Sequence, residues 1–315
     1  MTSLFDPIAL RETTVRNRIW VPALCQYSAL ARDGVPTDWH LAHLGSFAIG
    51  GAGLIIAEAT AVVADGRISA HDTGIWNDEQ AVAWRRVTDF LHAQGATAGI
   101  QLAHAGRKAS TYPAWGFEEH GSVPLDAGFD LVELHAAHGY LLHQFLSPLS
   151  NHREDAYGGS LENRARLLLE IVRAVRAELG DAVPLLVRFS ATDYAAGGWD
   201  AEQTETVAGW ARDAGADLFD ISSGGLVSGV HIPLGPGYQV PFSARVRDGA
   251  DVATAAVGLI TEVAQAATIV ETGQADAVLL GREMMRDPHF ALRAAHELGV
   301  ELDYWPPQYL RARWS

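Results

Sequence analysis

The amino-acid sequence predicts an α/β fold, a (β/α)8 TIM barrel. Eight short apolar runs, rich in β-branched residues, recur along the 315 residues, and amphipathic segments separate several of them. Short apolar runs without polar alternation are typical of parallel strands that are buried on both faces. No proline- or serine-rich linker and no change in composition divides the chain. We therefore expect a single barrel domain over residues 1–315.

The expected strands and helices alternate in the order that such a barrel requires. The strands are Ile19–Leu24, Leu54–Ala59, Ala98–Ala103, Leu131–His135, Leu185–Ser190, Leu218–Ser222, Ala253–Gly258 and Ala277–Gly281. The helices are Asp38–Ile49, Asp78–Gln94, Leu161–Leu179, Ala201–Ala214 and Thr261–Thr272. Thr37 and Ser160 are expected N-caps, and Gly95 is expected to follow the end of a helix.

Composition excludes several classes of function. With 23 Lys+Arg against 38 Asp+Glu, the net charge is −15 and the pI is near 5.2, which argues against nucleic acid or an anionic membrane as the main partner. The single cysteine, Cys25, cannot form an intrachain disulfide, which fits a reducing cytoplasm. Charged residues interrupt the N-terminal segment, so we expect no signal peptide. The longest uncharged apolar run has 14 residues, too few to span a bilayer.

One connection breaks the barrel pattern. Residues 107–128, between the third and fourth expected strands, are rich in glycine, proline and aromatic residues and contain no convincing helix. A parallel crossover is usually helical. The helix expected here is therefore either deleted or missing from the printed sequence. We favour the second explanation, which predicts a spatial gap within residues 118–128.

Polar and titratable residues gather at the carboxyl ends of the expected strands, where barrel active sites form. They are Cys25, Tyr27, Thr60, Gln101, His104, His135, His138, Tyr140, Arg188, Ser222 and Arg282. The glycines at the last two strand ends, Gly258 and Gly281, expose backbone N–H groups in the loops that recurrently bind phosphate. Arg282 could add a bidentate contact to that phosphate.

The segment HAAHGY, residues 135–140, allows three interpretations. His135 and His138 could bind a metal, with further ligands drawn from His104, His143 or Glu133. They could instead be buried histidines with ordinary hydrogen bonds. In the third interpretation the two histidines donate hydrogen bonds to a substrate oxygen, and a neutral phenol, Tyr140, supplies a proton.

Several long motifs resemble the Old Yellow Enzyme family of flavin-dependent ene-reductases, over nearly the whole chain. They are PALCQY at 22–27, QLAHAGRK at 101–108, the block from 127 to 164, VRFS at 187–190 and LLGREMMRDP at 279–288. A cysteine at position 25 with Tyr27 close behind is similar to the thermophilic-like branch of that family.

The resemblance implies non-covalent FMN across the barrel mouth and NADPH or NADH as reductant. It places Gln101 and Arg188 at the pyrimidine edge of the flavin, and Pro22, Ala23, Cys25 and Ala59 around the isoalloxazine ring. Cys25 would modulate the redox potential rather than act as a nucleophile. Gly258, Gly281 and Arg282 would bind the phosphate.

The resemblance also implies the reaction, which is reduction of electron-poor alkenes such as α,β-unsaturated aldehydes, ketones, imides and nitroalkenes. Hydride passes from flavin N5 to Cβ, Tyr140 protonates Cα, and His135 and His138 hold the activating oxygen. Tyr27 would line the substrate pocket. Arg311 would enter the neighbouring subunit's pocket, so a homodimer or homotetramer is expected.

Two other functions stay open at this point. A metal-dependent barrel hydrolase would use the histidines of HAAHGY as ligands. A non-catalytic flavin binder would keep the phosphate site without turnover. An absorbance near 450 nm would exclude the first, and enone-dependent oxidation of NADPH would exclude the second.

Overall fold

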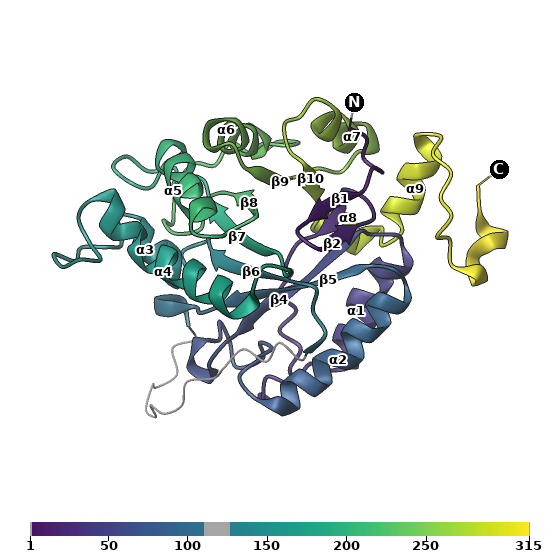
Figure 1. The fold of residues 1–315 in the computed structure, drawn as a ribbon, viewed down its shortest axis with the longest axis horizontal. Coiled ribbons are helices and arrows are strands. Elements are labelled where there is room, and N and C mark those ends of the chain that lie inside the picture. The colour runs from purple at the N-terminus through teal and green to yellow at the C-terminus, as the bar shows by residue number, and fades with distance from the viewer. Residues whose placement is uncertain (1, 110–126, 315) are drawn as a thin grey trace.

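A closed barrel of eight parallel strands forms the centre of the protein (Figure 1). The computed structural model describes residues 2–109 and 127–314. The strands follow one another around the barrel in the order β10-β3-β4-β5-β6-β7-β8-β9, which confirms the predicted (β/α)8 architecture. Their bounds are β3 Ile19–Val21, β4 Leu54–Ala61, β5 Thr97–Ala103, β6 Leu131–Ala136, β7 Leu185–Ser190, β8 Leu218–Ser222, β9 Ala253–Val257 and β10 Ala277–Leu279.

Helices surround the barrel on the outside (Figure 1). Their bounds are α1 Asp38–Ile49, α2 Asp78–Ala93, α3 Leu141–Leu146, α4 Leu161–Leu179, α5 Ala201–Asp213, α6 Val240–Ala250, α7 Val263–Glu271, α8 Arg282–Arg286 and α9 Phe290–Glu297, with short 3-10 turns η1 Ala64–Gly66, η2 Gly106–Lys108 and η4 Pro307–Ala312. Both predicted N-caps are confirmed. Ser160 Oγ accepts the Asn163 N–H, and Thr37 forms a capping box with His40.

Two apolar cores hold these layers together. The larger lies between the strands and the helices, and it includes Trp84, Phe189 and Phe219. The smaller fills the barrel interior around Trp20 and Leu186. Alternate residues of a strand point to opposite faces, so every strand has residues that face the barrel interior. Near the carboxyl ends of the strands these interior positions can be polar, while the interior positions closer to the amino ends stay apolar.

A small hairpin that the sequence analysis did not predict packs against the interior core. Strands β1 Ile8–Leu10 and β2 Thr13–Val15 pair antiparallel ahead of the first barrel strand. Leu10 and Val15 belong to the interior cluster with Trp20, so the hairpin covers the amino end of the barrel. Because the hairpin covers the amino end of the barrel, a functional site is expected at the carboxyl ends of the strands.

Several predicted boundaries were wrong by a few residues. The first barrel strand ends at Val21 rather than Leu24, and the last ends at Leu279 rather than Gly281. In both cases the apolar run continues past the last residue that is register-paired with a neighbouring strand. The helix expected over Thr261–Thr272 covers only Val263–Glu271. The helices α3, α6, α8 and α9 were not predicted.

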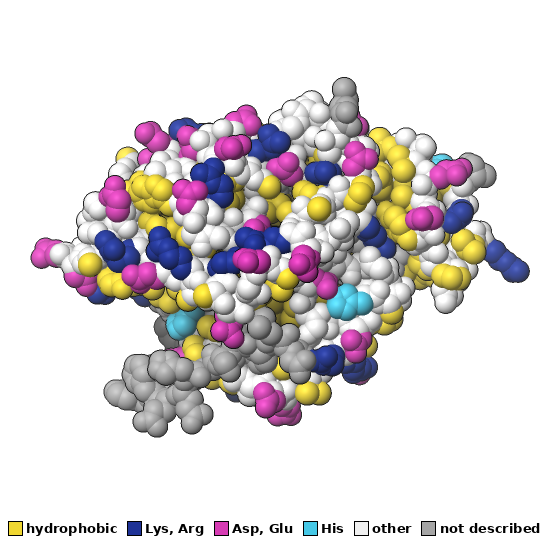
Figure 2. Space-filling view, in the orientation of Figure 1, with side chains coloured by type: hydrophobic (Ala, Val, Ile, Leu, Met, Phe, Trp, Pro, Cys, Tyr) yellow, Lys and Arg dark blue, Asp and Glu magenta, His cyan; other side chains and the backbone are white. Residues whose placement is uncertain are grey.

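The connection between β5 and β6 cannot be compared with the prediction. The expected gap within residues 118–128 falls almost entirely on residues 110–126, which lie outside the described residues. Within residues 2–109 and 127–314, no helix is long and apolar enough to cross a membrane. Acidic and basic side chains are interspersed over the face that Figure 2 shows, without a large basic region.

Candidate functional site

A cavity of about 200 Å³ lies at the carboxyl ends of the barrel strands. Six of the nine predicted cofactor residues line it: Pro22, Ala23, Arg188, Gly258, Gly281 and Arg282. They come from β7 and from the segments that follow β3, β9 and β10. The remaining three, Cys25, Ala59 and Gln101, do not line this cavity but lie on neighbouring strands or loops of the same rim.

The glycine-lined end of the cavity suits a phosphate. Gly258 has φ +125°, which favours glycine, and a Cβ there would lie 2.8 Å from Gln239 Nε2. Gly281 precedes α8, and Arg282 is the first residue of that helix. Arg282 is exposed and has no ion-pair partner within the described part of the chain. Its guanidinium is therefore available to an anionic group.

Arg188 is held at the cavity by a buried ion pair. Its Nη1 lies 2.9 Å from Asp220 Oδ2, and the two residues are register partners on β7 and β8. Burial raises the pKa of Asp220 to about 6, against the opposing effect of Arg188, so the carboxylate is ionised above neutral pH. Among the described residues, Arg188 Nε is buried without a hydrogen-bond partner. A ligand atom placed at the cavity could satisfy that donor.

A second buried pair lies on the adjacent strands. Gln101 Nε2 donates to Glu133 Oε1 at 2.7 Å, and these residues are register partners on β5 and β6. Burial, together with the negative charge of Asp220, raises the pKa of Glu133 to about 8. Glu133 Oε2 has no hydrogen-bond partner within residues 2–109 and 127–314. Gln101 and Arg188, the two side chains expected at the flavin's pyrimidine edge, are thus each oriented by a buried acid.

The loop after β3 carries Cys25 and Tyr27 next to another buried acid. The Gln26 N–H donates to Glu58 Oε1 at 3.3 Å. Burial raises the pKa of Cys25 to about 12, and the nearby Glu58 adds to that shift, so the thiol stays neutral. A neutral thiol fits the expectation that Cys25 is not a nucleophile. Tyr27 has φ +53° and is 48% exposed.

His135, His138 and Tyr140 come together at the end of β6. The ring centroids of His135 and Tyr140 are 4.8 Å apart, and those of the two histidines are 5.5 Å apart. Burial, and then the positive charge of Arg188, lowers the pKa of both histidines well below the usual value, so both rings are neutral. His135 Nδ1 is buried, and no residue in the described part of the chain forms a hydrogen bond with it. The same cluster buries Tyr140 enough to raise the pKa of its phenol to about 12.

The metal-binding interpretation of HAAHGY does not fit these contacts. His143 is occupied by Asp193 and by the Gly139 N–H, while Glu133 is occupied by Gln101. His104 Nδ1 accepts the Gly106 N–H. Across residues 2–109 and 127–314, no three His, Cys, Asp or Glu side chains are grouped in a way that could hold a metal ion.

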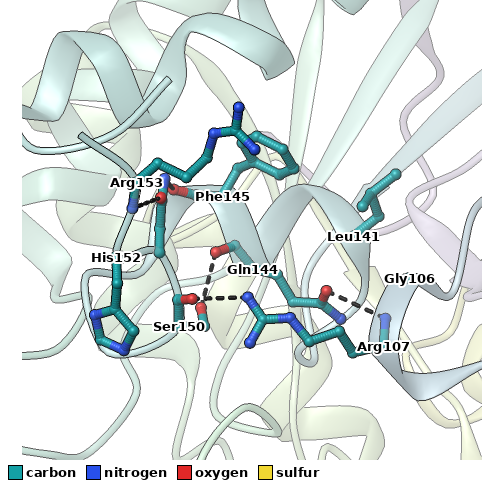
Figure 3. A pocket seen from close by; sticks show the side chains of 9 residues that line it. Gly106, Arg107, Leu141, Gln144, Phe145, Ser150, His152 and Arg153 are labelled. Carbon is teal, nitrogen blue, oxygen red and sulfur yellow. Dashed lines mark hydrogen bonds between the residues drawn. The ribbon is translucent and has the colours of Figure 1, made fainter. Parts of the chain in front are cut away.

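Two features lie away from this cavity. Arg311 is exposed on η4, in the C-terminal segment beside α9 (Figure 1). A cavity of about 500 Å³ lies between η2, α3 and the segment 150–153, and none of the predicted site residues lines it (Figure 3). Arg107 Nη2 donates to the Ser150 carbonyl oxygen there, and the Ser150 hydroxyl donates to the Gln144 carbonyl oxygen (Figure 3).

Sequence reasoning missed several residues of the site, and four of them matter most to its chemistry. Asp220 pairs with Arg188, Tyr238 and Gln239 line the cavity, and Lys108 lies over the Tyr140 ring at 5.4 Å. Asp220 carried a usable signal, because it is an acid in the middle of an apolar strand. The sequence does not show that strand pairing places Asp220 opposite Arg188. The other three lie on connections or a helix whose position relative to the barrel the sequence pattern does not give.

Comparisons with known proteins agree with the fold and show the family of the chain. A family model described as the NADH:flavin oxidoreductase / NADH oxidase family matches residues 3–114 and 116–301. The NADPH dehydrogenase of Listeria innocua is 47% identical over 99% of both chains, and that of Bacillus subtilis is 45% identical over 98% of both chains. The Listeria alignment spans 343 positions, more than the 315 residues here, so that relative has residues that this chain lacks.

Solved structures of an Old Yellow Enzyme homologue and of morphinone reductase have a similar fold. The Old Yellow Enzyme homologue of Zymomonas mobilis is 26% identical, with a TM-score of 0.77 and full coverage of both chains. Morphinone reductase is 28% identical, with a TM-score of 0.75, covering 97% of this chain and 92% of the other.

Proposed function

The chain belongs to the NADH:flavin oxidoreductase / NADH oxidase family, and from that premise we propose that it is an ene-reductase. As a member it is an NAD(P)H-dependent flavin oxidoreductase that uses FMN. The finer proposal is that its oxidising substrates are alkenes activated by a carbonyl or nitro group. The observation that carries this proposal is the cluster of His135, His138 and Tyr140, which combines two neutral imidazoles with a protonated phenol.

The residues around the cavity fit FMN. Gly258, Gly281 and Arg282 would hold its phosphate, since backbone N–H groups and a free guanidinium suit an anion. Arg188, whose Nε lacks a partner among the described residues, and Gln101 would contact the pyrimidine edge. Pro22, Ala23 and Ala59 would pack around the ring. Bound FMN would supply hydride transfer at N5, and the protein would orient and polarise the substrate beside it.

The histidine pair would bind the activating oxygen of the alkene. A neutral imidazole donates one hydrogen bond, and two such donors aimed at one oxygen stabilise the negative charge that develops there. The lowered pKa values favour this role, because both rings stay neutral and keep their ring N–H through neutral pH. Donation by His138 Nδ1 requires the Ser222 hydroxyl to donate to Nε2, from which it lies 2.8 Å away.

Tyr140 would donate the proton to Cα. Its phenol lies beside the His135 ring, and its raised pKa keeps it protonated over the whole physiological range. Cys25, kept as a neutral thiol, would modulate the flavin's potential, and the exposed Tyr27 would line the substrate pocket.

Three broader features belong to the same proposal. We expect one domain over residues 1–315, a cytoplasmic location, and a homodimer or homotetramer. In that assembly the exposed Arg311 would reach the neighbouring subunit's pocket. Small electron-poor alkenes would be the partners, rather than nucleic acid or membranes.

One experiment tests the proposed function. The purified protein should absorb near 450 nm, and under anaerobic conditions it should oxidise more than one equivalent of NADPH per flavin only when 2-cyclohexenone is present. The product should be cyclohexanone in a 1:1 ratio to the NADPH consumed. Flavin absorbance without enone-dependent oxidation would instead indicate a flavin binder that does not reduce alkenes.

A further inference from the structure

A completely buried contact between a histidine and a carboxylate lies next to the turn that leads to Tyr140. His143, on α3, places its Nε2 3.1 Å from Asp193 Oδ1, and both side chains are fully buried. Asp193 follows β7, so the pair joins two different βα loops. Neither side chain lines the cavity described above. The proposed contacts with FMN and substrate therefore leave this pair without a role.

The hydrogen bonds fix which nitrogen of His143 carries the proton. The Gly139 N–H donates to Nδ1 at 2.9 Å, so Nδ1 is the acceptor and has no hydrogen. The proton of the neutral ring is then on Nε2 and faces Asp193. The Ser147 hydroxyl and the Trp199 N–H also donate to Asp193, at 2.6 and 2.8 Å. Burial alone would raise the pKa of Asp193, but the hydrogen bonds from His143 and Ser147 lower it, so the acid is a carboxylate.

The turn itself needs such support. His138 has φ +55° and Gly139 has φ +76°, in the left-handed region that a non-glycine residue such as histidine adopts at a cost. A Cβ at Gly139 would lie 2.9 Å from the Gly225 carbonyl oxygen, so the backbone passes close to the loop after β8. On the α3 side, His143 accepts the Gly139 N–H, and Gln144 Nε2 donates to the Gly139 carbonyl oxygen at 2.6 Å. Tyr140 is the next residue, at the N-cap of α3.

We infer that Asp193 and His143 form a positioning pair that holds the Tyr140 phenol beside the His135 ring. The carboxylate selects the His143 tautomer, that tautomer accepts the Gly139 N–H, and this bond anchors the turn that orients Tyr140. The inference rests on the proposed role of Tyr140 as proton donor. Without the carboxylate, the ring can place its proton on Nδ1, where it would face the Gly139 N–H instead of accepting it.

Two substitutions at position 143 distinguish the contact with the Gly139 N–H from the contact with Asp193. In His143→Asn, an amide oxygen can occupy the place of Nδ1 and accept the Gly139 N–H. In His143→Gln, the longer side chain reaches toward Asp193 but leaves the Gly139 N–H without its acceptor. Asp193→Asn removes the charge that selects the tautomer. Asp276→Asn is the control, since Asp276, like Asp193, accepts a backbone N–H, but it pairs with Arg247 and precedes β10 at the opposite end of the barrel.

Anaerobic stopped-flow measurement of the two half-reactions tests the inference. His143→Gln and Asp193→Asn should slow reoxidation by 2-cyclohexenone about tenfold or more, because a small misplacement of a reacting group has large effects on rate. Reduction by NADPH should stay within about twofold of wild type, and His143→Asn and Asp276→Asn should resemble wild type in both steps. Equal losses in both half-reactions, or a His143→Gln variant as fast as His143→Asn, would overturn the inference.

Two spectroscopic measurements do not depend on alkene reduction, and the first of them needs no variant. In wild-type protein, ¹⁵N NMR of labelled histidine should show His143 as the Nε2–H tautomer, and the Nδ1–H tautomer would refute the arrangement. In protein labelled at tyrosine ¹³Cζ, the Tyr140 signal, assigned with Tyr140→Phe, should shift in His143→Gln but not in His143→Asn. If wild type does not reduce enones but these signals behave as expected, the proposed function fails while the positioning role stands.

Discussion

His138 Nε2 lies 2.8 Å from Ser222 Oγ, which joins the turn after β6 to the end of β8. The Ser222 hydroxyl has one proton and two acceptors within reach, His138 Nε2 and Gln239 Oε1 at 3.3 Å. Ser223 already donates to Gln239 Oε1 at 2.5 Å. If Ser222 donates to His138 Nε2, both His138 Nε2 and Gln239 Oε1 accept a hydrogen bond. The proton of the neutral His138 ring is then on Nδ1.

Ser222→Ala should therefore weaken the binding of phenolate ligands. Without the hydroxyl, His138 loses the donor that fixes its tautomer, and one hydrogen bond to the ligand's oxygen is lost part of the time. We expect a loss of about 1 kcal/mol, or roughly fivefold in Kd, by titration of the flavin charge-transfer band with p-hydroxybenzaldehyde. Ser243→Ala is the control, since Ser243 is equally buried but bonds Thr254 away from the site. Equal effects of both substitutions would contradict the assignment.

Replacing both His135 and His138 by alanine should have a larger effect on the same titration. Two donors to an anionic oxygen are lost, each worth roughly 1.5–3 kcal/mol. Addition of a chelator should leave the wild-type affinity unchanged, since the proposal includes no metal. If the double variant binds phenolates as tightly as wild type does, these histidines do not form the anion site.

Asp220→Asn should make the flavin's reduction potential more positive. Its carboxylate neutralises Arg188, so its loss leaves the guanidinium charge uncompensated beside the electron-rich reduced flavin. A shift on the order of tens of millivolts is expected, measured by equilibration with redox dyes at pH 8, where Asp220 is ionised in wild type. The control is Asp276→Asn at the other end of the barrel. A negative shift, or none, would show that Asp220 does not set the charge at the pyrimidine edge.

Arg311→Ala should raise the KM for the enone without changing the oligomer. The side chain is exposed in the described chain and is proposed to act in a neighbouring subunit, so its removal should weaken substrate binding rather than assembly. Arg313→Ala is a suitable control, because Arg313 packs over Trp305 of its own chain. Truncation after Pro307 should raise the KM as well. If the truncated protein keeps both the sedimentation coefficient and the KM of wild type, the segment is a surface tail.

The barrel was predictable because each of its strands lies in an apolar run of at least five residues, even where the strand itself has only three, as in β3 and β10. Short elements escaped prediction for the opposite reason. The three-residue strands β1 and β2 and the five-residue α8 are below the length at which periodicity is measurable. The positions of His135, His138 and Tyr140 followed from one contiguous motif.

Asp193 and Asp220 could not be assigned from sequence, because their partners lie on other elements. Asp193 is 50 residues away from His143 along the chain, and only the barrel closure brings them together. Asp220 meets Arg188 through strand register, which an apolar pattern does not specify. In general, a buried acid that orients a site can be assigned only once the fold shows which residue of another element lies next to it.

The pH dependence of proton transfer follows from the raised pKa of Tyr140. Burial, with a contribution from Cys25, moves that pKa upward to about 12, so the protonated form persists to higher pH than for an exposed phenol. Reoxidation of the flavin by an enone should therefore keep its rate up to about pH 10 and decline only above it.

The central claim is that Tyr140 protonates the alkene, and the half-reactions of Tyr140→Phe test it most directly. Stopped-flow measurement should show reduction by NADPH within about twofold of wild type, because that step needs no proton from this phenol. Reoxidation by 2-cyclohexenone should be slower by about 10²-fold or more, and its loss of rate at high pH should disappear. Equal slowing of both half-reactions, or an unchanged rate of reoxidation, would contradict the account.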